Sequence, residues 1–160
     1  MGHSITALIV TGEPDRAAAA EWGVEPVPLG EGRWLVPITH YFTAYQQARL
    51  GETEALDVSA SFPAVFPREG VVLRLAAALT ANPFALVMTD YFGGMGGQWA
   101  CVFAGGRRVG GIERINAALR ELGVERRGEL DEFDTVGLGA YRHPPDELDR
   151  YEALCDELGV

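Results

Sequence analysis

The chain contains no lysine, and arginine supplies all thirteen of its basic residues. Schiff-base catalysis and the phosphate-binding P-loop both require a lysine amine. Both mechanisms are therefore excluded. Together with the high alanine and glycine content, the missing lysine indicates a GC-rich bacterial genome.

Cysteine is also scarce, because Cys101 and Cys155 are the only two and neither has another cysteine within metal-motif spacing. Secreted domains of this size more often carry an even set of closely spaced cysteines. Residues 1–10 lack the basic stretch of a signal peptide, and the most apolar window, residues 71–81, is too short to span a bilayer. We therefore expect a cytoplasmic protein that does not enter the membrane.

Complete catalytic motifs are missing as well. The three serines lie in no nucleophile-elbow pattern. The four glycines between residues 93 and 97 do not have dinucleotide-motif spacing, since the last glycine would fall at Trp99. His40 has no ligand partner at helical spacing, although a catalytic pair of His40 with Cys101 in space stays open. A cysteine in an apolar strand is more typical of a buried thiol, and we expect neither a metal nor a cofactor.

The apolar patterns predict a single α+β domain over residues 1–160. Strands are expected at 5–10, 24–29, 33–38, 84–91, 98–103 and 108–109, with a further extended, edge-strand segment at 133–141. Helices are expected at 14–22, 40–50, 70–81, 112–122 and 145–158, although residues 40–45 also fit an extension of the preceding strand. Because adjacent hairpins argue against an all-parallel sheet, we predict a mixed or mainly antiparallel sheet with helices packed on it.

Acidic residues concentrate near the C-terminus. The chain has a formal net charge of −10, of which residues 129–160 contribute −8 with ten acids and two arginines. An acidic surface repels phosphate backbones, so we expect no nucleic-acid binding. Such a surface attracts a basic protein partner, and the alternative is a solvated face that keeps the protein soluble.

A glycine-rich hairpin is the most unusual part of the sequence. Residues 92–97 form the predicted connection, and Asp90, Tyr91, Gln98 and Trp99 flank it with polar and aromatic groups. The glycines either satisfy positive-φ positions in a bulged hairpin or allow a protein or small molecule to come close. In the small-molecule alternative, His40 and Asp90 form the proton-handling pair and Tyr91 and Gln98 position the ligand.

A second cluster contains three acids around one aromatic residue: Asp131, Glu132 and Asp134. Carboxylates are preferred ligands of hard cations, but the spacing does not fit an EF-hand loop because no glutamate closes it. A solvated acidic turn is the alternative interpretation, and we predict no metal site.

Two motifs carry a resemblance to a known group of proteins. Residues 91–98 read Tyr-Phe-Gly-Gly-Met-Gly-Gly-Gln, and residues 131–139 read Asp-Glu-Phe-Asp-Thr-Val-Gly-Leu-Gly. Over residues 85–142 the chain resembles small uncharacterised bacterial proteins, some of which are toxin-immunity proteins. The resemblance implies a small, acidic and non-enzymatic protein, and it brings no catalytic residues with it.

The leading hypothesis is therefore a non-enzymatic acidic binding protein of the immunity or inhibitor type that contacts a basic bacterial protein. Asp131, Glu132 and Asp134 would steer the partner, and Tyr91 and Trp99 would anchor it. The first alternative is a small-molecule binder or enzyme with its site beside the hairpin 91–98. A homo-oligomerisation module is the second alternative.

Overall fold

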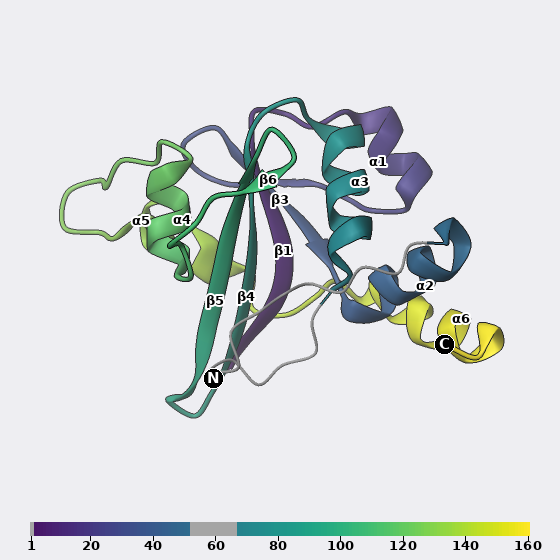
Figure 1. Ribbon diagram of the computed structural model, residues 1–160. Helices are drawn as coiled ribbons and strands as arrows, with labels where there is room; N and C mark the ends of the chain where they lie inside the picture. Colours follow the sequence, from purple (N-terminus) through teal and green to yellow (C-terminus); the bar gives the residue numbers. More distant parts are fainter. Residues whose placement is uncertain (1, 52–66) are drawn as a thin grey trace.

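A six-stranded antiparallel sheet forms the centre of the molecule in the computed structural model, which describes residues 2–51 and 67–160 (Figure 1). The sequence predicts an irregular segment over residues 52–68, and most of it lies outside the described residues. The strands are β1 (His3–Thr11), β2 (Val27–Pro28), β3 (Arg33–Ile38), β4 (Phe84–Phe92), β5 (Met95–Ala104) and β6 (Arg107–Arg108). Their order is β2-β3-β1-β4-β5-β6, and every pair of neighbours among them is antiparallel. The predicted α+β class and mainly antiparallel sheet are confirmed.

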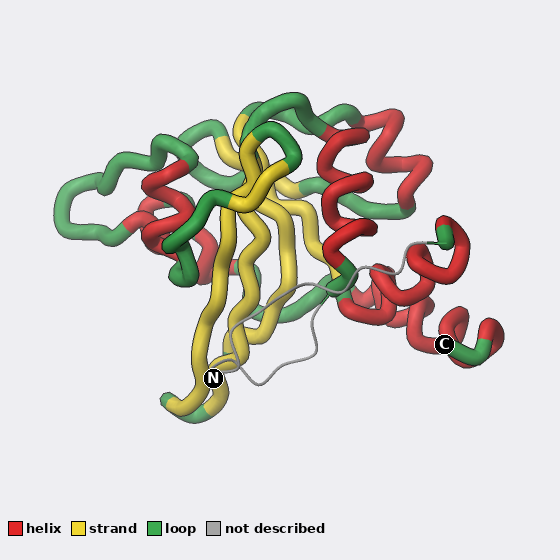
Figure 2. The backbone as a smooth tube through the Cα atoms, in the orientation of Figure 1, coloured by secondary structure: helices red, strands yellow, loops and turns green. Residues whose placement is uncertain are grey.

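Helices cover both faces of the sheet (Figure 2). The helical elements are α1 (Arg16–Trp22), α2 (His40–Leu50), α3 (Glu69–Leu79), α4 (Ile115–Glu121), α5 (Glu132–Thr135), η1 (Leu138–Ala140), η2 (Asp146–Asp149) and α6 (Arg150–Leu158). Helices α1, α2, α3 and α6 lie on one side of the sheet, and α4 and α5 lie on the other (Figure 1).

The alternation of side chains along β1 explains this two-sided arrangement. Leu8 and Val10 join the core beneath α1, α2, α3 and α6. Ile5, Ala7 and Ile9 join the second core, beneath α4 and α5. Since both faces are apolar, each must be covered to remove it from water, at about 25 cal/mol per Å² of apolar surface.

Local capping signals fix where the first helices begin and end. The Thr39 side chain accepts a hydrogen bond from the Phe42 backbone N–H, which caps α2. Asp15 caps α1 in the same way through the Ala18 N–H. Gly23 and Gly51 end these helices in the left-handed conformation. The predicted helix over 40–50 is therefore confirmed, and the alternative strand extension is wrong.

The predicted extended segment at 133–141 is wrong, because the chain forms α5 and η1 there. The Asp131 side chain accepts a hydrogen bond from the Asp134 backbone N–H and so begins a short helix. Gly137 then takes a left-handed conformation with φ 78° between the two turns. These local turns satisfy the backbone without strand pairing.

Two strand boundaries also differ from the prediction. The β4–β5 connection is a two-residue turn at Gly93 and Gly94, with Phe92 paired to Met95, and not a six-residue loop. Positive φ at both glycines gives the turn geometry that matches the twist of a tight hairpin, so the strands run on to its end. In the predicted edge strand 24–29, only Val27–Pro28 pair with β3.

Candidate functional site

The glycines of the β4–β5 hairpin have structural reasons for being glycine. Gly93 and Gly94 have φ values of 59° and 80° in the turn. Gly96 has φ 131°, and a Cβ there would lie 1.8 Å from the carbonyl oxygen of Asp90. No side chain fits at that distance, so the close approach of the two strands itself requires glycine.

The polar residues of the hairpin bind one another and α4. Gln98 Nε2 donates to Tyr91 Oη at 3.1 Å, and Gln98 Oε1 accepts from the Ile115 N–H at 2.9 Å. Trp99 is only 2% exposed, and the guanidinium of Arg108 lies 4.9 Å from its ring centroid. Asp90 is exposed. The structure therefore leaves Asp90 and part of Tyr91 on the surface and places Trp99 in the core.

The hairpin ends in two exposed apolar side chains, which are not among the site residues predicted from the sequence. Phe92 is 82% exposed and Met95 is 78% exposed. They are cross-strand partners at the turn, so they lie side by side. The hairpin projects beyond the helices that cover the rest of the sheet (Figure 1). This apolar pair, which we call the hairpin tip, is an accessible contact for another molecule.

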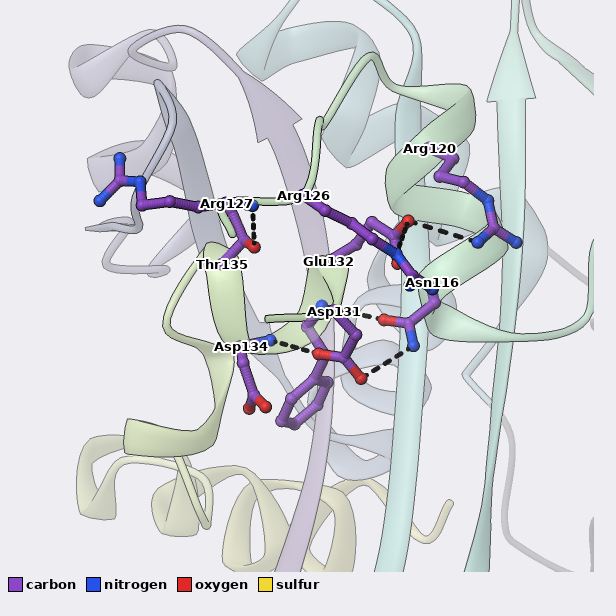
Figure 3. Close-up of polar contacts among 9 residues, drawn as sticks. Asn116, Arg120, Arg126, Arg127, Asp131, Glu132, Asp134 and Thr135 are labelled. Atoms are coloured by element: carbon purple, nitrogen blue, oxygen red, sulfur yellow. Dashed lines mark hydrogen bonds and ion pairs between the residues drawn. The ribbon is translucent and has the colours of Figure 1, made fainter. Parts of the chain in front are cut away.

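The acids around residue 132 form an internal network (Figure 3). Glu132 is 1% exposed, and its Oε1 accepts from Arg126 Nε at 3.0 Å and from Arg120 Nη1 at 3.3 Å. Asp131 accepts from the Asp134 N–H at 2.9 Å and from Asn116 Nδ2 at 3.1 Å. We call the three acids Asp131, Glu132 and Asp134, together with Asn116, Arg120 and Arg126, the carboxylate network. It joins α4 to α5.

Electrostatics keep the two inner acids of the network ionised. Burial alone raises the pKa of Glu132, but hydrogen bonds and the charges of Arg126 and Arg120 outweigh it and hold this pKa below 4.5. The backbone N–H of Asp134 is the main cause of a lowered pKa at Asp131. Asp134 alone keeps an exposed carboxylate, which points away from the network in Figure 3. Glu132 has no exposed surface to offer a partner.

His40 lines a different part of the molecule, a surface pocket of about 250 Å³ between β1, α2 and the C-terminal segment. Tyr41 Oη donates to Glu152 Oε1 at 3.4 Å, and the rings of His40 and Tyr41 lie 4.0 Å apart. Asp149 lines the same pocket, three residues before Glu152 and so on the same side of the helix. We call this the acidic pocket.

The charge state of the acidic pocket suits a cationic guest. Burial lowers the pKa of His40, and the charge of Glu152 only partly opposes this shift. Glu152 in turn raises the pKa of Tyr41. A neutral imidazole and a phenol beside two carboxylates therefore surround the space at neutral pH.

The proposed pairing of His40 with Asp90 finds no common cavity. Asp90 is not among the residues that line the acidic pocket. Within the described part of the chain, no residue of 90–99 lines the acidic pocket or either of two further surface cavities near Glu25 and Pro145.

The state of the Cys101 thiol does not favour a catalytic pair of His40 with Cys101. Cys101 is fully buried, which raises its pKa to about 12. A thiol in that state supplies no thiolate nucleophile at neutral pH.

The acidic C-terminal segment, residues 146–157, carries the largest group of exposed acids in this region. All six of its carboxylates are exposed: Asp146, Glu147, Asp149, Glu152, Asp156 and Glu157. None of the six forms an ion pair with another described residue. Arg150 is the one basic residue of the segment, and its Nη2 donates to Tyr151 Oη at 3.0 Å. The negative charge of this segment therefore faces solvent.

Residues 2–51 and 67–160 contain no group of three or more histidine, cysteine or acidic side chains placed to hold a metal ion. In the same residues, no helix is both long and apolar enough to cross a membrane.

The sequence alone did not indicate which residues would contact the predicted site residues. Arg120 and Arg126 form ion pairs with Glu132 from outside α5, and no local spacing in the sequence predicts these pairs. The three-residue spacing of Asp149 and Glu152 did carry a signal, since it puts both acids on one side of a helix. Phe92 and Met95 on either side of two glycines also mark a turn with an apolar end.

Comparison of the chain with protein-family models, curated proteins and solved structures found no match. The fold defines an α+β domain with a six-stranded antiparallel sheet. The resemblance to small bacterial immunity proteins stays a prediction.

Proposed function

We propose that the protein is a non-enzymatic acidic binding protein, of the immunity or inhibitor type, that docks onto a basic surface of another bacterial protein. The acidic C-terminal segment carries this proposal. Its six carboxylates are exposed and none forms an ion pair with an arginine among the described residues, although the charge of Arg150 acts on Glu147. Uncompensated charge of one sign speeds the encounter with a surface of the other sign and rejects acidic competitors.

The placement of two of these acids supports a role outside the fold. Asp156 and Glu157 lie in the last turn of α6, and this turn contains no basic residue. The helix dipole makes the C-terminal end partly negative, so carboxylates there are unfavourable. Their position does not serve the stability of α6, whereas it does add negative charge to the exposed surface.

In this proposal the acidic pocket binds one basic side chain of the partner. Asp149 and Glu152 supply two carboxylates, and Tyr41 with His40 supplies aromatic rings against which a guanidinium stacks. An arginine side chain of the partner would thus be held by charge and by ring contact together. This arrangement gives position as well as attraction.

The hairpin supplies a second contact region in this proposal. Phe92 and Met95 at the hairpin tip are accessible anchors, and Tyr91 and Asp90 lie beside them on β4. Asp134 adds an exposed acid on α5. Trp99 and Glu132 act behind this surface, since both are buried.

A cytoplasmic location belongs to the same proposal. Cys101 and Cys155 are both buried and unpaired. Free thiols are the usual state in a reducing compartment.

Matched charge variants test the proposal. The first variant neutralises five acids of the C-terminal segment: Asp146→Asn, Glu147→Gln, Asp149→Asn, Asp156→Asn and Glu157→Gln. The control removes the same number of charges from exposed, unpaired acids elsewhere: Glu21→Gln, Glu113→Gln, Glu121→Gln, Glu125→Gln and Glu129→Gln. A third variant, Glu152→Gln, removes charge from the acidic pocket alone.

Each variant serves as bait for affinity capture from bacterial lysate at low and high salt, with quantification by mass spectrometry. We expect a basic protein that wild type and control recover at low salt and lose at high salt. The five-acid variant should bind that protein about tenfold more weakly, since each exposed pair contributes up to about 1 kcal/mol. Equal recovery by the five-acid and control variants, or recovery that ignores salt, would contradict the proposal.

A further inference from the structure

A cavity of about 330 Å³ lies against the sheet face that α4 and α5 cover, between that face and the strap formed by residues 140–145. The floor consists of buried apolar side chains, including Ile5 and Ala7 of β1 and Leu35 of β3. Tyr141 Oη donates to the Pro28 carbonyl oxygen at 3.2 Å, which ties the strap to β2. We call this the apolar cavity, and its size is in the range of small-molecule sites.

Two charged residues and one histidine interrupt its apolar lining. Arg142 and His143 come from the strap, and Glu25 comes from the segment before β2. Within the described part of the chain, the side chains of Arg142 and His143 make no hydrogen bond or ion pair. Arg142 and His143 are both exposed at the apolar cavity, so the hydrogen-bonding groups of their side chains are available to a ligand.

We propose that the apolar cavity binds a small monocarboxylate with an apolar body, of the aryl or branched-alkyl acid class. The body would displace water from the floor at Ala7 and Leu35, and this burial supplies the hydrophobic part of the affinity. The planar guanidinium of Arg142 matches a carboxylate in geometry and charge, and His143 adds a further donor. Glu25 repels a second anionic group, so the cavity selects acids with a single charge.

This site is inferred without reliance on the proposed docking of a basic protein. It uses other side chains, and its ligand has the opposite charge to the guest of the acidic pocket. Failure of either proposal leaves the other standing.

The test uses phenylacetate as probe and the neutral amide phenylacetamide as its uncharged counterpart, in a titration of the ¹⁵N-labelled protein followed by NMR. We expect saturable shifts of backbone amides in residues 140–143 and in the facing parts of β1 and β3. Phenylacetate should bind roughly fivefold or more tightly than phenylacetamide, because only the acid forms a charge-assisted pair with Arg142.

Variants separate the two parts of the site. Arg142→Gln should weaken phenylacetate binding by about fivefold or more and leave phenylacetamide unchanged. The control Arg107→Gln changes an exposed arginine on β6, at the opposite edge of the sheet from β2, and should alter neither affinity. Val27→Phe fills the cavity from the edge strand and should weaken both probes.

Several results would overturn the proposal: the absence of saturable shifts around the cavity, equal affinity for acid and amide, or equal losses in Arg142→Gln and Arg107→Gln. If Val27→Phe does not fold, the comparison of the two arginine variants across the two probes still decides the outcome.

Discussion

At the scale of single residues, Glu132 shows how a predicted surface acid becomes part of the interior. Its carboxylate is buried at 1% exposure while the two arginines that bind it remain about half exposed, at 55% each. Oε2 has no hydrogen-bond partner among the described residues, so one oxygen carries the whole interaction. Burial of a charge is tolerated only when it is paired, and here the exposed arginines supply the charge at modest desolvation cost.

Substitution of this residue should reveal the value of the pair. Glu132→Gln keeps the shape and removes the charge, and it should lower the free energy of unfolding by about 1–2 kcal/mol at neutral pH. Glu129→Gln, at an exposed and unpaired acid, should change it by less than about 0.5 kcal/mol. Urea denaturation of the three proteins provides the measurement.

The pH dependence of that difference has a fixed sign. Because the pKa of Glu132 in the folded protein lies below its ordinary value of 4.5, ionisation stabilises the fold. This stabilisation is complete above pH 4.5 and is lost as the pH falls through the lower, folded-state pKa. The gap between wild type and Glu132→Gln should therefore shrink on acidification below that point, and a gap that widens would contradict the ion-pair interpretation.

At the scale of elements, the β4–β5 hairpin depends on glycine for two separate reasons. Gly93 and Gly94 need left-handed backbone conformations, which glycine adopts without steric cost. Gly96 needs empty space as well, because the Asp90 carbonyl oxygen occupies the site of its missing side chain. The glycine-rich sequence is thus accounted for by the hairpin itself, and recognition falls to the side chains at its tip.

A pair of alanine substitutions separates conformation from crowding. Gly96→Ala should cost roughly 2–4 kcal/mol of unfolding free energy, since backbone strain and a steric clash act together. Gly105 in the β5–β6 turn has φ 60°, and a Cβ added there would have nothing within 4 Å. Gly105→Ala should therefore lower the free energy of unfolding by only about 1 kcal/mol. Thermal unfolding of both variants measures the difference, and similar losses would show that the close contact in the hairpin is relieved cheaply.

At the scale of the whole molecule, one of the two cysteines lies on a central strand and the other on a peripheral helix. Cys101 lies on β5 in the main core, fully buried between sheet and helices. Cys155 lies on α6, which packs against α2, and its thiol donates to the Tyr41 carbonyl oxygen at 3.2 Å. The end of α6 is open to solvent, since Leu158 and Val160 are exposed. A peripheral helix opens locally at lower free energy than a central strand.

Iodoacetamide labelling with peptide mass spectrometry should therefore distinguish the two thiols. We expect Cys155 to react first in mild urea through local opening of α6, and Cys101 to react only at the rate of global unfolding. Both should be slow in the native state because burial raises the pKa of each thiol. Equal labelling rates at all urea concentrations would indicate that α6 unfolds only together with the sheet.

Much of this fold could be predicted because the apolar period of each main element is visible locally. The alternation along 33–38 and the helical spacing along 70–81 both gave elements that the structure contains. The segment 133–141 could not be assigned, since its turns depend on the Asp131 cap and on the left-handed Gly137. The carboxylate network, the acidic pocket and the apolar cavity need the tertiary arrangement, because each combines residues distant in sequence.

The strap of residues 140–145 serves as a partition between two chambers. Pro144 lines the acidic pocket, while its neighbours His143 and Pro145 line the apolar cavity. A single backbone hydrogen bond, from the Ser4 N–H to the Arg142 carbonyl oxygen at 2.7 Å, fastens this partition to β1. An occupant of one chamber that displaces the partition must change affinity in the other, and thermodynamic linkage makes the effect equal in both directions. Under the two proposals made above, a small acid that displaces the strap would alter protein docking, and the docked protein would alter binding of the acid by the same factor.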